Sequence, residues 1–217
     1  RLAAGVLERG ADKLLITPEA VCDLKTIVNE LKLSQGKMDL VPATITKIEH
    51  AGLGHRVCVD TTSILKTGEG MLVGNTSAFT FLVNAETESN PYVAARPFRI
   101  NAGAVHAYCQ MPGDKTRYLE ELSSGSEVLI VSHQGATKTA VVGRVKTEIR
   151  PMLLITAEVG GKEGKVFLQN AETIRLVTPE GKPVSVVAIK EGDTVLVSTD
   201  VAGRHFGMRI AEEIKEG

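Results

Sequence analysis

The chain has 217 residues and a formal net charge of −1, with 43% hydrophobic and 24% charged residues. This is the composition of a globular protein long enough to bury a core, and its near-neutral charge gives no field that would attract nucleic acid. Aromatic residues make up only 4% and Trp is absent, which disfavours an RNA-binding or ribosome-associated domain that stacks bases. No apolar run approaches the roughly 20 residues that cross a bilayer, so we expect no membrane span.

Residues 1–39 have the pattern of the C-terminal part of an α/β domain. A helix is expected to end near Gly10, a short strand follows over Lys13–Thr17, and Pro18 opens a second helix. Pro in the first helical turn, followed by apolar residues three and four apart, is a helix start signal. A strand between two helices cannot form a domain alone, and the chain begins at Arg1 without Met. We therefore expect an N-terminally truncated chain.

From residue 40 onward the pattern changes to short apolar runs between Gly-rich turns, which predicts a β-rich, barrel-like domain over residues 40–217. Together with the N-terminal unit this gives an α+β fold class. In the second domain, helix is expected only near Thr116–Leu122 and at the C-terminus. Turns are expected at Lys66–Gly70, Pro112–Asp114, Gly160–Gly161 and Pro179–Gly181. The expected strands are Ala43–Ile48, Arg56–Asp60, Gly70–Gly74, Phe79–Val83, Glu127–Val131, Thr139–Val145, Met152–Ala157, Lys165–Leu168, Thr173–Val177 and Thr194–Val197.

The three cysteines are widely spaced and form no CxxC pair. Such a sparse, odd set is typical of a reducing compartment rather than of a disulfide-bonded scaffold, so we expect a cytoplasmic protein. The cysteines are Cys22, Cys58 and Cys109.

The segment Ala95–Leu122 concentrates cationic side chains among short apolar runs, with Asp114 as the only acid before Glu120. Because Arg and Lys bring charge-assisted donors to an anion, this pattern indicates a site for a carboxylate or a phosphate. A solvated basic loop is the alternative interpretation, and the sequence leaves both open. The candidate residues are Arg96, Arg99, His106, Lys115 and Arg117.

Other polar groups stand where loops of a barrel could converge on one mouth. Asp60 ends a short apolar strand, Gln169–Glu172 follows another, and Arg204–His205 lies near the C-terminus. A His that titrates beside Arg and a carboxylate makes an acid–base set. The alternatives are a His satisfied within the core and acids that cap turns, which also applies to Glu69 and Glu86.

Neither a metal site nor a dinucleotide-binding fingerprint is predicted. The spacing of the His and Cys residues matches no standard zinc module. Gly68, Gly70 and Gly74 have GxGxxxG spacing, but the residues that follow read as a strand. A phosphate-binding Gly loop needs the N-terminus of a following helix, so the cofactor-binding residues stay unknown.

Eight ordered blocks of the chain resemble the type II 3-dehydroquinate synthases, a family best known from archaea with relatives in plants and some bacteria. The resemblance extends from about Gly5 to the C-terminus. The blocks are Val57–Thr61, Gly68–Gly74, Arg96–Arg99, Asn101–Ala107, Lys115–Leu119, Val142–Lys146, Leu168–Thr173 and Arg204–Met208.

The resemblance implies an NAD-dependent oxidative deamination of 2-amino-3,7-dideoxy-D-threo-hept-6-ulosonate, followed by ring closure to 3-dehydroquinate. This reaction belongs to an alternative shikimate route to aromatic amino acids. NAD is then the expected cofactor and a small molecule the expected partner, and a homo-oligomer or a larger assembly stays open. A source in a photosynthetic eukaryote would place the protein in the plastid stroma instead of the cytoplasm.

The implied reaction needs Arg groups for a substrate carboxylate and proton carriers for imine hydrolysis and aldol closure. The substrate-binding candidates are Arg96, Arg99, Arg117, Asn170 and Arg204. The catalytic candidates are His106, Lys115 and His205, with Asp60 and Glu172 as carboxylate partners.

The chain departs from the family pattern after the Phe-Leu-Val strand, where it has Asn84-Ala85-Glu86 in place of His-Ser-Glu. Members of the family also extend further at the N-terminus. Losing an imidazole and a hydroxyl removes a potential proton carrier. The alternative function is therefore a catalytically inactive homologue that serves as a structural or small-molecule-binding subunit of a larger assembly.

Overall fold

The computed structural model describes residues 36–89, 91, 93–200, 204–205 and 208–209, with side chains up to residue 200. Most of the α/β unit expected over residues 1–39 therefore lies outside the described residues, as does helix at the C-terminus. The described ranges contain no α-helix, so they support a β-rich fold and not the predicted α+β class. No helix within them is long and apolar enough to cross a membrane.

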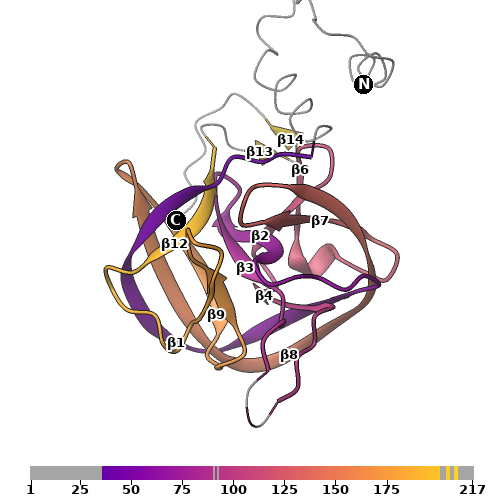
Figure 1. The fold of residues 1–217 in the computed structure, drawn as a ribbon, viewed down its shortest axis with the longest axis horizontal. Coiled ribbons are helices and arrows are strands. Elements are labelled where there is room, and N and C mark those ends of the chain that lie inside the picture. The colour runs from indigo at the N-terminus through magenta and orange to yellow at the C-terminus, as the bar shows by residue number, and fades with distance from the viewer. Residues whose placement is uncertain (1–35, 90, 92, 201–203, 206–207, 210–217) are drawn as a thin grey trace, which may run out of the picture.

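Turns and longer loops connect the strands, and the described residues contain a single 3₁₀ turn, η2, over Leu119–Glu121 (Figure 1). In chain order they are β1 (Val41–Thr61), β2 (Glu69–Thr76), β3 (Phe79–Asn84), β4 (Arg99–Ala104), β5 (Tyr108–Met111), β6 (Lys115–Tyr118), β7 (Glu127–Ser132), β8 (Thr137–Val159), β9 (Lys162–Gln169), β10 (Arg175–Val177), β11 (Pro183–Ser185), β12 (Thr194–Thr199), β13 (Arg204–His205) and β14 (Met208–Arg209).

The main sheet closes on itself. Antiparallel pairing runs in the order β3–β12–β1–β8–β7–β2, and β2 pairs back to β3, which completes a ring (Figure 1). The strands β4, β5, β9 and β10 pair to members of this ring. Closure removes open sheet edges, which is the main advantage of a barrel over a flat sheet. The barrel-like character expected from many short strands is thus present in the described residues.

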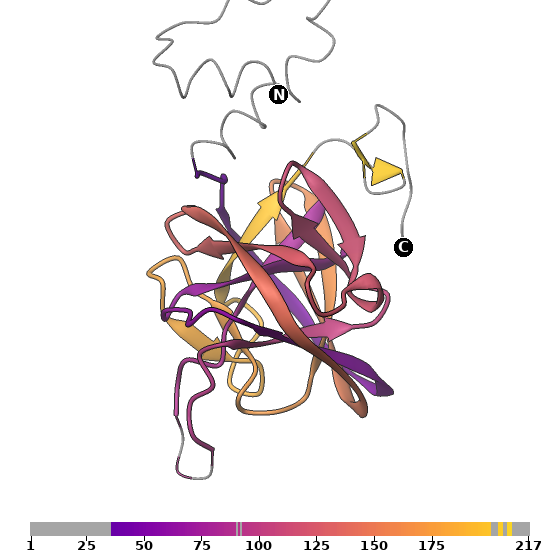
Figure 2. The ribbon, with the colours of Figure 1, turned by 90° about the vertical axis from the view of Figure 1, so that its right-hand side faces the viewer.

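The ring depends on the two longest strands, β1 and β8, which pair along almost their whole length and curve around the molecule (Figures 1 and 2). Their register shifts between Ile45 and Lys47, between His50 and Leu53, and again at the end of β1. Such bulges bend and twist a strand pair, so one pair can serve two walls of a ring. This is why the separately expected strands Ala43–Ile48 and Arg56–Asp60 are one strand.

A large apolar core fills the ring. It takes alternate residues of most strands, such as Met71 and Val73 of β2 and Phe81 and Val83 of β3, all of which are fully buried. The residues between them belong to a second, smaller apolar cluster on the other face, where Met38 and Leu40 pack against it. With apolar cover on both faces, β2 and β3 are continuous apolar runs rather than alternating ones.

Turn chemistry is the most accurate part of the sequence prediction. The β8–β9 connection is the two-residue turn Gly160–Gly161, with φ of 58° and 78°, the backbone that a tight hairpin requires.

The helix predicted at Thr116–Leu122 is wrong. Residues 115–118 pair with β5 instead, and only the 3₁₀ turn follows, anchored by the buried Leu119.

Candidate functional site

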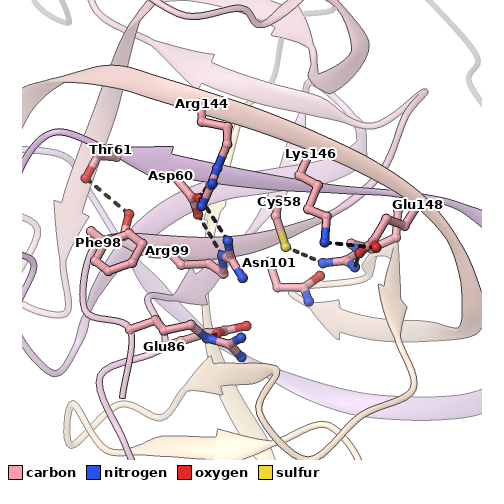
Figure 3. Close-up of polar contacts among 12 residues, drawn as sticks. Cys58, Asp60, Thr61, Glu86, Phe98, Arg99, Asn101, Arg144, Lys146 and Glu148 are labelled. Atoms are coloured by element: carbon pink, nitrogen blue, oxygen red, sulfur yellow. Dashed lines mark hydrogen bonds and ion pairs between the residues drawn. The ribbon is translucent and has the colours of Figure 1, made fainter. Parts of the chain in front are cut away.

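Three adjacent strands, β4, β1 and β8, share a polar face on the side away from the main core. Along β1, Arg56, Cys58 and Asp60 alternate with Val57 and Val59, which belong to the core. Cys58 and Asp60 lie opposite polar residues of both neighbouring strands (Figure 3), and Arg56 lies opposite Glu148 of β8. We call the following residues the polar face: Arg56, Cys58, Asp60, Arg99, Asn101, Arg144, Lys146 and Glu148.

The first row of the polar face is Arg99–Asp60–Arg144. Arg99 donates to both oxygens of the Asp60 carboxylate, from Nε to Oδ1 at 2.7 Å and from Nη2 to Oδ2 at 2.8 Å. Arg144 Nε donates to Oδ2 at 2.8 Å from the other side. Burial raises the pKa of Asp60, but the hydrogen bonds from both guanidinium groups outweigh it and hold the pKa below its ordinary value.

The third row joins Arg56 to Glu148. The buried Arg56 donates from Nη2 to Glu148 Oε2 at 2.6 Å and from Nη1 to the Cys58 sulfur. Lys146 Nζ lies 2.9 Å from the other carboxylate oxygen of Glu148. The hydrogen bond from Lys146 lowers the pKa of Glu148, so this carboxylate is ionised at neutral pH.

The middle row, Asn101–Cys58–Lys146, lies between the two ion-paired rows. Asn101 donates from Nδ2 to Gln169 Oε1 at 2.9 Å, which connects β4 to the end of β9. Burial raises the pKa of the Cys58 thiol, and the nearby Arg56 and Arg99 only partly offset this. The thiol is therefore neutral at neutral pH and is a weak nucleophile.

The β3–β4 connection adds a third carboxylate, Glu86, beside the polar face. Glu86 is 4% exposed and lies 2.6 Å from Arg96 Nε. Its backbone N–H donates to the Arg99 carbonyl at 2.8 Å, so it borders the first row (Figure 3). Burial raises the pKa of Glu86 above its ordinary value, although Arg96 and Arg99 pull it down.

The polar face carries an excess of positive charge. Its four cationic side chains face two carboxylates, and both carboxylates are already engaged by buried or half-buried arginines. The excess therefore lies on Arg144 and Lys146, whose side chains are 63% and 50% exposed. A surface of this kind can bind a small anion such as a carboxylate or a phosphate.

His106 lies elsewhere, in the β4–β5 connection. Its Nε2 is 3.3 Å from Asn75 Oδ1, and its ring packs edge-on against Phe167 with centroids 5.4 Å apart. Burial lowers the pKa of His106, so the ring is neutral at neutral pH and able to accept a proton.

The other expected site residues are dispersed. Lys115 and Arg117 lie on β6, at one end of the strand order, and no hydrogen bond or ion pair within the described residues joins their side chains to the polar face. Asn170 and the exposed Glu172 follow β9, where Glu172 accepts a hydrogen bond from Ser185 at its carbonyl. Gln169, the last residue of β9, contacts the polar face through its hydrogen bond with Asn101. The side chains of Arg204 and His205 lie outside the described residues.

Several members of the polar face were missed by sequence reasoning, although two signals could have found them. Arg56-Val-Cys-Val-Asp60 and Arg144-Val-Lys-Thr-Glu148 both alternate polar and mainly β-branched residues, as a strand with a polar outer face does. The missed residues are Arg56, Cys58, Asn101, Arg144, Lys146 and Glu148.

Asn84, the first residue of the Asn84-Ala85-Glu86 segment, has a structural role. Asn84 is 2% exposed, and its Oδ1 accepts a hydrogen bond at 2.9 Å from the backbone N–H of Gly68. The side-chain amide of Asn84 also donates to the carbonyl of Ala85. Asn84 thus stabilises the turn before β2. Glu86, two residues further along the chain, borders the polar face.

No group of three or more His, Cys, Asp or Glu side chains that could hold a metal ion occurs in the part of the chain that the structure describes.

Fold and site together define a barrel-like β-domain with a cation-rich polar face on one wall. Residues 42–217 match the family described as the 3-dehydroquinate synthase II C-terminal domain. The chain therefore belongs to the 3-dehydroquinate synthase II family.

Curated relatives agree with this assignment. The chain is 51% identical over 217 residues to the 3-dehydroquinate synthase of Methanocaldococcus jannaschii, covering 100% of this chain and 60% of the relative. It is 52% identical over 216 residues to that of Methanothrix thermoacetophila, covering 99% and 59%. A protein of Persephonella marina named 3-dehydroquinate synthase homolog is 51% identical over 215 residues, covering 99% and 65%. No solved structure matches the chain.

Proposed function

We propose that this chain is part of a type II 3-dehydroquinate synthase and that its polar face belongs to the active site. The observation that carries the proposal is an identity of about one half to proteins of that name along the entire chain. The chain spans about 60% of the length of these relatives, so the activity is proposed for the whole protein. The reaction is the oxidative deamination of 2-amino-3,7-dideoxy-D-threo-hept-6-ulosonate and its cyclisation to 3-dehydroquinate.

Substrate binding is proposed at the cationic groups that border the polar face. Arg96 is 34% exposed at its side chain and is held by Glu86, so it can reach a carboxylate without leaving its partner. Arg99 uses two of its donors on Asp60 and acts mainly as a rigid support for that carboxylate. Arg117, Asn170 and Arg204 stay candidates for parts of the substrate further from this face.

Proton transfer is proposed for His106 first, because its neutral, exposed ring can accept a proton from the imine or aldol step. Asp60 is held ionised between two guanidinium groups, which supports an electrostatic role toward a developing cation rather than a proton-carrying one. Lys115, Glu172 and His205 stay candidates for the remaining proton transfers.

The family implies NAD, which supplies hydride acceptance when bound. The described residues contain no helix N-terminus following a Gly-rich turn, which is the arrangement that commonly holds a dinucleotide pyrophosphate. This part of the chain therefore does not fit a complete dinucleotide site, and we derive no step through the cofactor. NAD dependence is proposed for the whole enzyme.

The test is an assay of the complete protein with the aminoheptulosonate substrate and NAD, following the appearance of NADH. We expect turnover, and we expect His106→Gln to lower it by about a hundredfold. His50→Gln, at an exposed position of β1, is the matched control and should keep full activity. A folded, complete protein without turnover would instead support a catalytically inactive homologue in a larger assembly. Wild-type turnover by His106→Gln would remove His106 from the mechanism.

A further inference from the structure

The middle row of the polar face contains a buried hydrogen-bond acceptor that no group of the described structure uses. Asn101 is 4% exposed, and its Nδ2 is engaged by Gln169. Its Oδ1 is buried and has no hydrogen-bond partner. Buried polar atoms are almost always paired, so an unpaired one at a functional surface indicates a place where a ligand donates.

A buried donor in the next row is unused as well. Arg56 binds Cys58 and Glu148 through its two terminal nitrogens, while its Nε is buried without a partner. Arg56 lies two positions before Cys58 on β1, on the same side of the strand, and the Asn101 side chain lies beside Cys58, between Arg99 and the Lys146–Glu148 pair (Figure 3). An acceptor together with a donor suits a hydroxyl group, which can donate and accept at once.

The exposed cations are close to the same row. Arg144 lies in the first row and Lys146 in the middle row, on alternate positions of β8, and both side chains are at least half exposed. Arg99 is a poorer choice for a ligand anion: both Arg99 and Arg144 give two donors to Asp60, but the Arg99 side chain is only 13% exposed. A ligand carboxylate that approaches from solvent would therefore contact Arg144 and Lys146 rather than the buried arginines.

We propose that the polar face binds a hydroxylated carboxylic acid, with the carboxylate against Arg144 and Lys146 and a hydroxyl donating to Asn101 Oδ1. Asn101 is then a specificity residue, which distinguishes a hydroxy acid from a plain carboxylate. The proposal rests on the proposed function, since 3-dehydroquinate is a hydroxylated carboxylate of this kind. It adds the residues that recognise the two groups.

The experiment measures binding of two probes to the full chain by titration calorimetry. The first probe is 3-dehydroquinate, and the second is cyclohexanecarboxylate, which keeps a ring and a carboxylate but has no hydroxyl. Wild type should bind 3-dehydroquinate about tenfold more tightly, as expected for one added hydrogen bond. Asn101→Leu, similar in size but without polar atoms, should abolish this preference while leaving the affinity for cyclohexanecarboxylate unchanged.

A double variant tests the carboxylate contact at exposed positions, where folding is not at risk. Arg144→Gln with Lys146→Gln should weaken both probes by about tenfold and keep their ratio. Arg150→Gln is the matched control. Arg150 is a half-exposed cation of the same strand, two residues after Glu148 and 3.2 Å from it. Its loss should change the affinity for neither probe.

Three results would overturn the proposal: no binding of either probe by wild type, an unchanged preference in Asn101→Leu, or a double variant that binds as well as Arg150→Gln. Should Asn101→Leu fail to fold, Asn101→Ser, which keeps a smaller polar side chain, must still reduce the preference. The outcome is independent of turnover. An inactive protein with the expected binding pattern would contradict only the proposed function, and an active one with an unchanged preference in Asn101→Leu would contradict only this inference.

Discussion

Arg99 and Asp60 face each other across the β1–β4 pair and form two parallel hydrogen bonds, an Arg–carboxylate fork with both side chains largely buried. Arg144, on β8, donates a hydrogen bond to the same carboxylate. Because these three residues come from different strands, their hydrogen bonds hold β1, β4 and β8 together at the edge of the polar face. Removing Asp60 would leave the largely buried Arg99 without its paired carboxylate.

Asp60→Asn should therefore be strongly destabilising. The substitution keeps the size of the side chain but leaves Arg99, only 13% exposed at its side chain, without its paired carboxylate. We expect the free energy of unfolding to fall by about 3 kcal/mol. Urea unfolding at neutral pH measures it. Glu49→Gln, which breaks the exposed Lys47–Glu49 pair, is the control and should cost less than about 0.5 kcal/mol. Equal losses in the two variants would contradict a structural role for the fork.

The same carboxylate should make stability sensitive to acid. The pKa of Asp60 in the folded protein lies below its ordinary value, so its stabilising contribution is present above the unfolded-state pKa and is lost as the pH falls through the folded-state pKa. The difference in unfolding free energy between wild type and Asp60→Asn should thus be constant near neutral pH and shrink below about pH 4. Urea unfolding from about pH 7 to about pH 3 tests this, and a difference that persists unchanged into acid would be inconsistent with it.

Local features of this fold could be predicted from the sequence, and long-range ones could not. The run Arg56–Asp60 shows its strand character by alternation alone, and Gly160–Gly161 shows its turn by residue type. The cross-strand partners of that run are different. Arg144 is 84 positions from Asp60 and Glu148 is 92 from Arg56, so their pairing depends on the register of β8. No local pattern specifies that register.

The candidate site illustrates the same limit. Sequence reasoning grouped the cations of residues 95–122 because they are close along the chain. Antiparallel folding separates them, since Arg99 lies on β4 beside β1 while Lys115 and Arg117 lie on β6. Neighbours in space come instead from β1 and β8. Which of the candidates catalyse stays a prediction, but their placement identifies the polar face and His106 as the first places to test.

Close packing at Gly70 gives a prediction about the ring itself. A Cβ at Gly70 would overlap the carbonyl oxygen of Val83 on the neighbouring β3, and backbone cannot move aside as a flexible side chain can. Gly70→Ala should cost about 2 kcal/mol or more of unfolding free energy. Gly143→Ala is the control, because its Cβ would meet Thr62 Cγ2 at 3.4 Å and the Asp60 carbonyl oxygen at 3.6 Å, both ordinary van der Waals contacts. Thermal or urea unfolding compares them, and a Gly70→Ala variant as stable as the control would contradict the tight β2–β3 contact.

Glu86 should respond to pH in the opposite sense to Asp60. Burial raises its pKa above the ordinary value of 4.5, with Arg96 and Arg99 pulling it down only in part. Between the unfolded-state and the folded-state pKa, the folded protein holds more of the proton than the unfolded chain does. Stability attributable to Glu86 is therefore present at low pH and falls as the pH rises through that window.

Glu86→Gln removes this titration while keeping the shape of the side chain. We expect the variant to lose the decline in stability that wild type shows just above pH 4.5, and at neutral pH to differ from wild type by less than about 1 kcal/mol. The neutral-pH cost is small because Arg96, one third exposed, can be hydrated once its partner is gone. Urea unfolding across this pH range gives both quantities. A neutral-pH loss as large as that of Asp60→Asn would mean that the ionised form of Glu86 is favoured by folding, which would reverse the direction of its pKa.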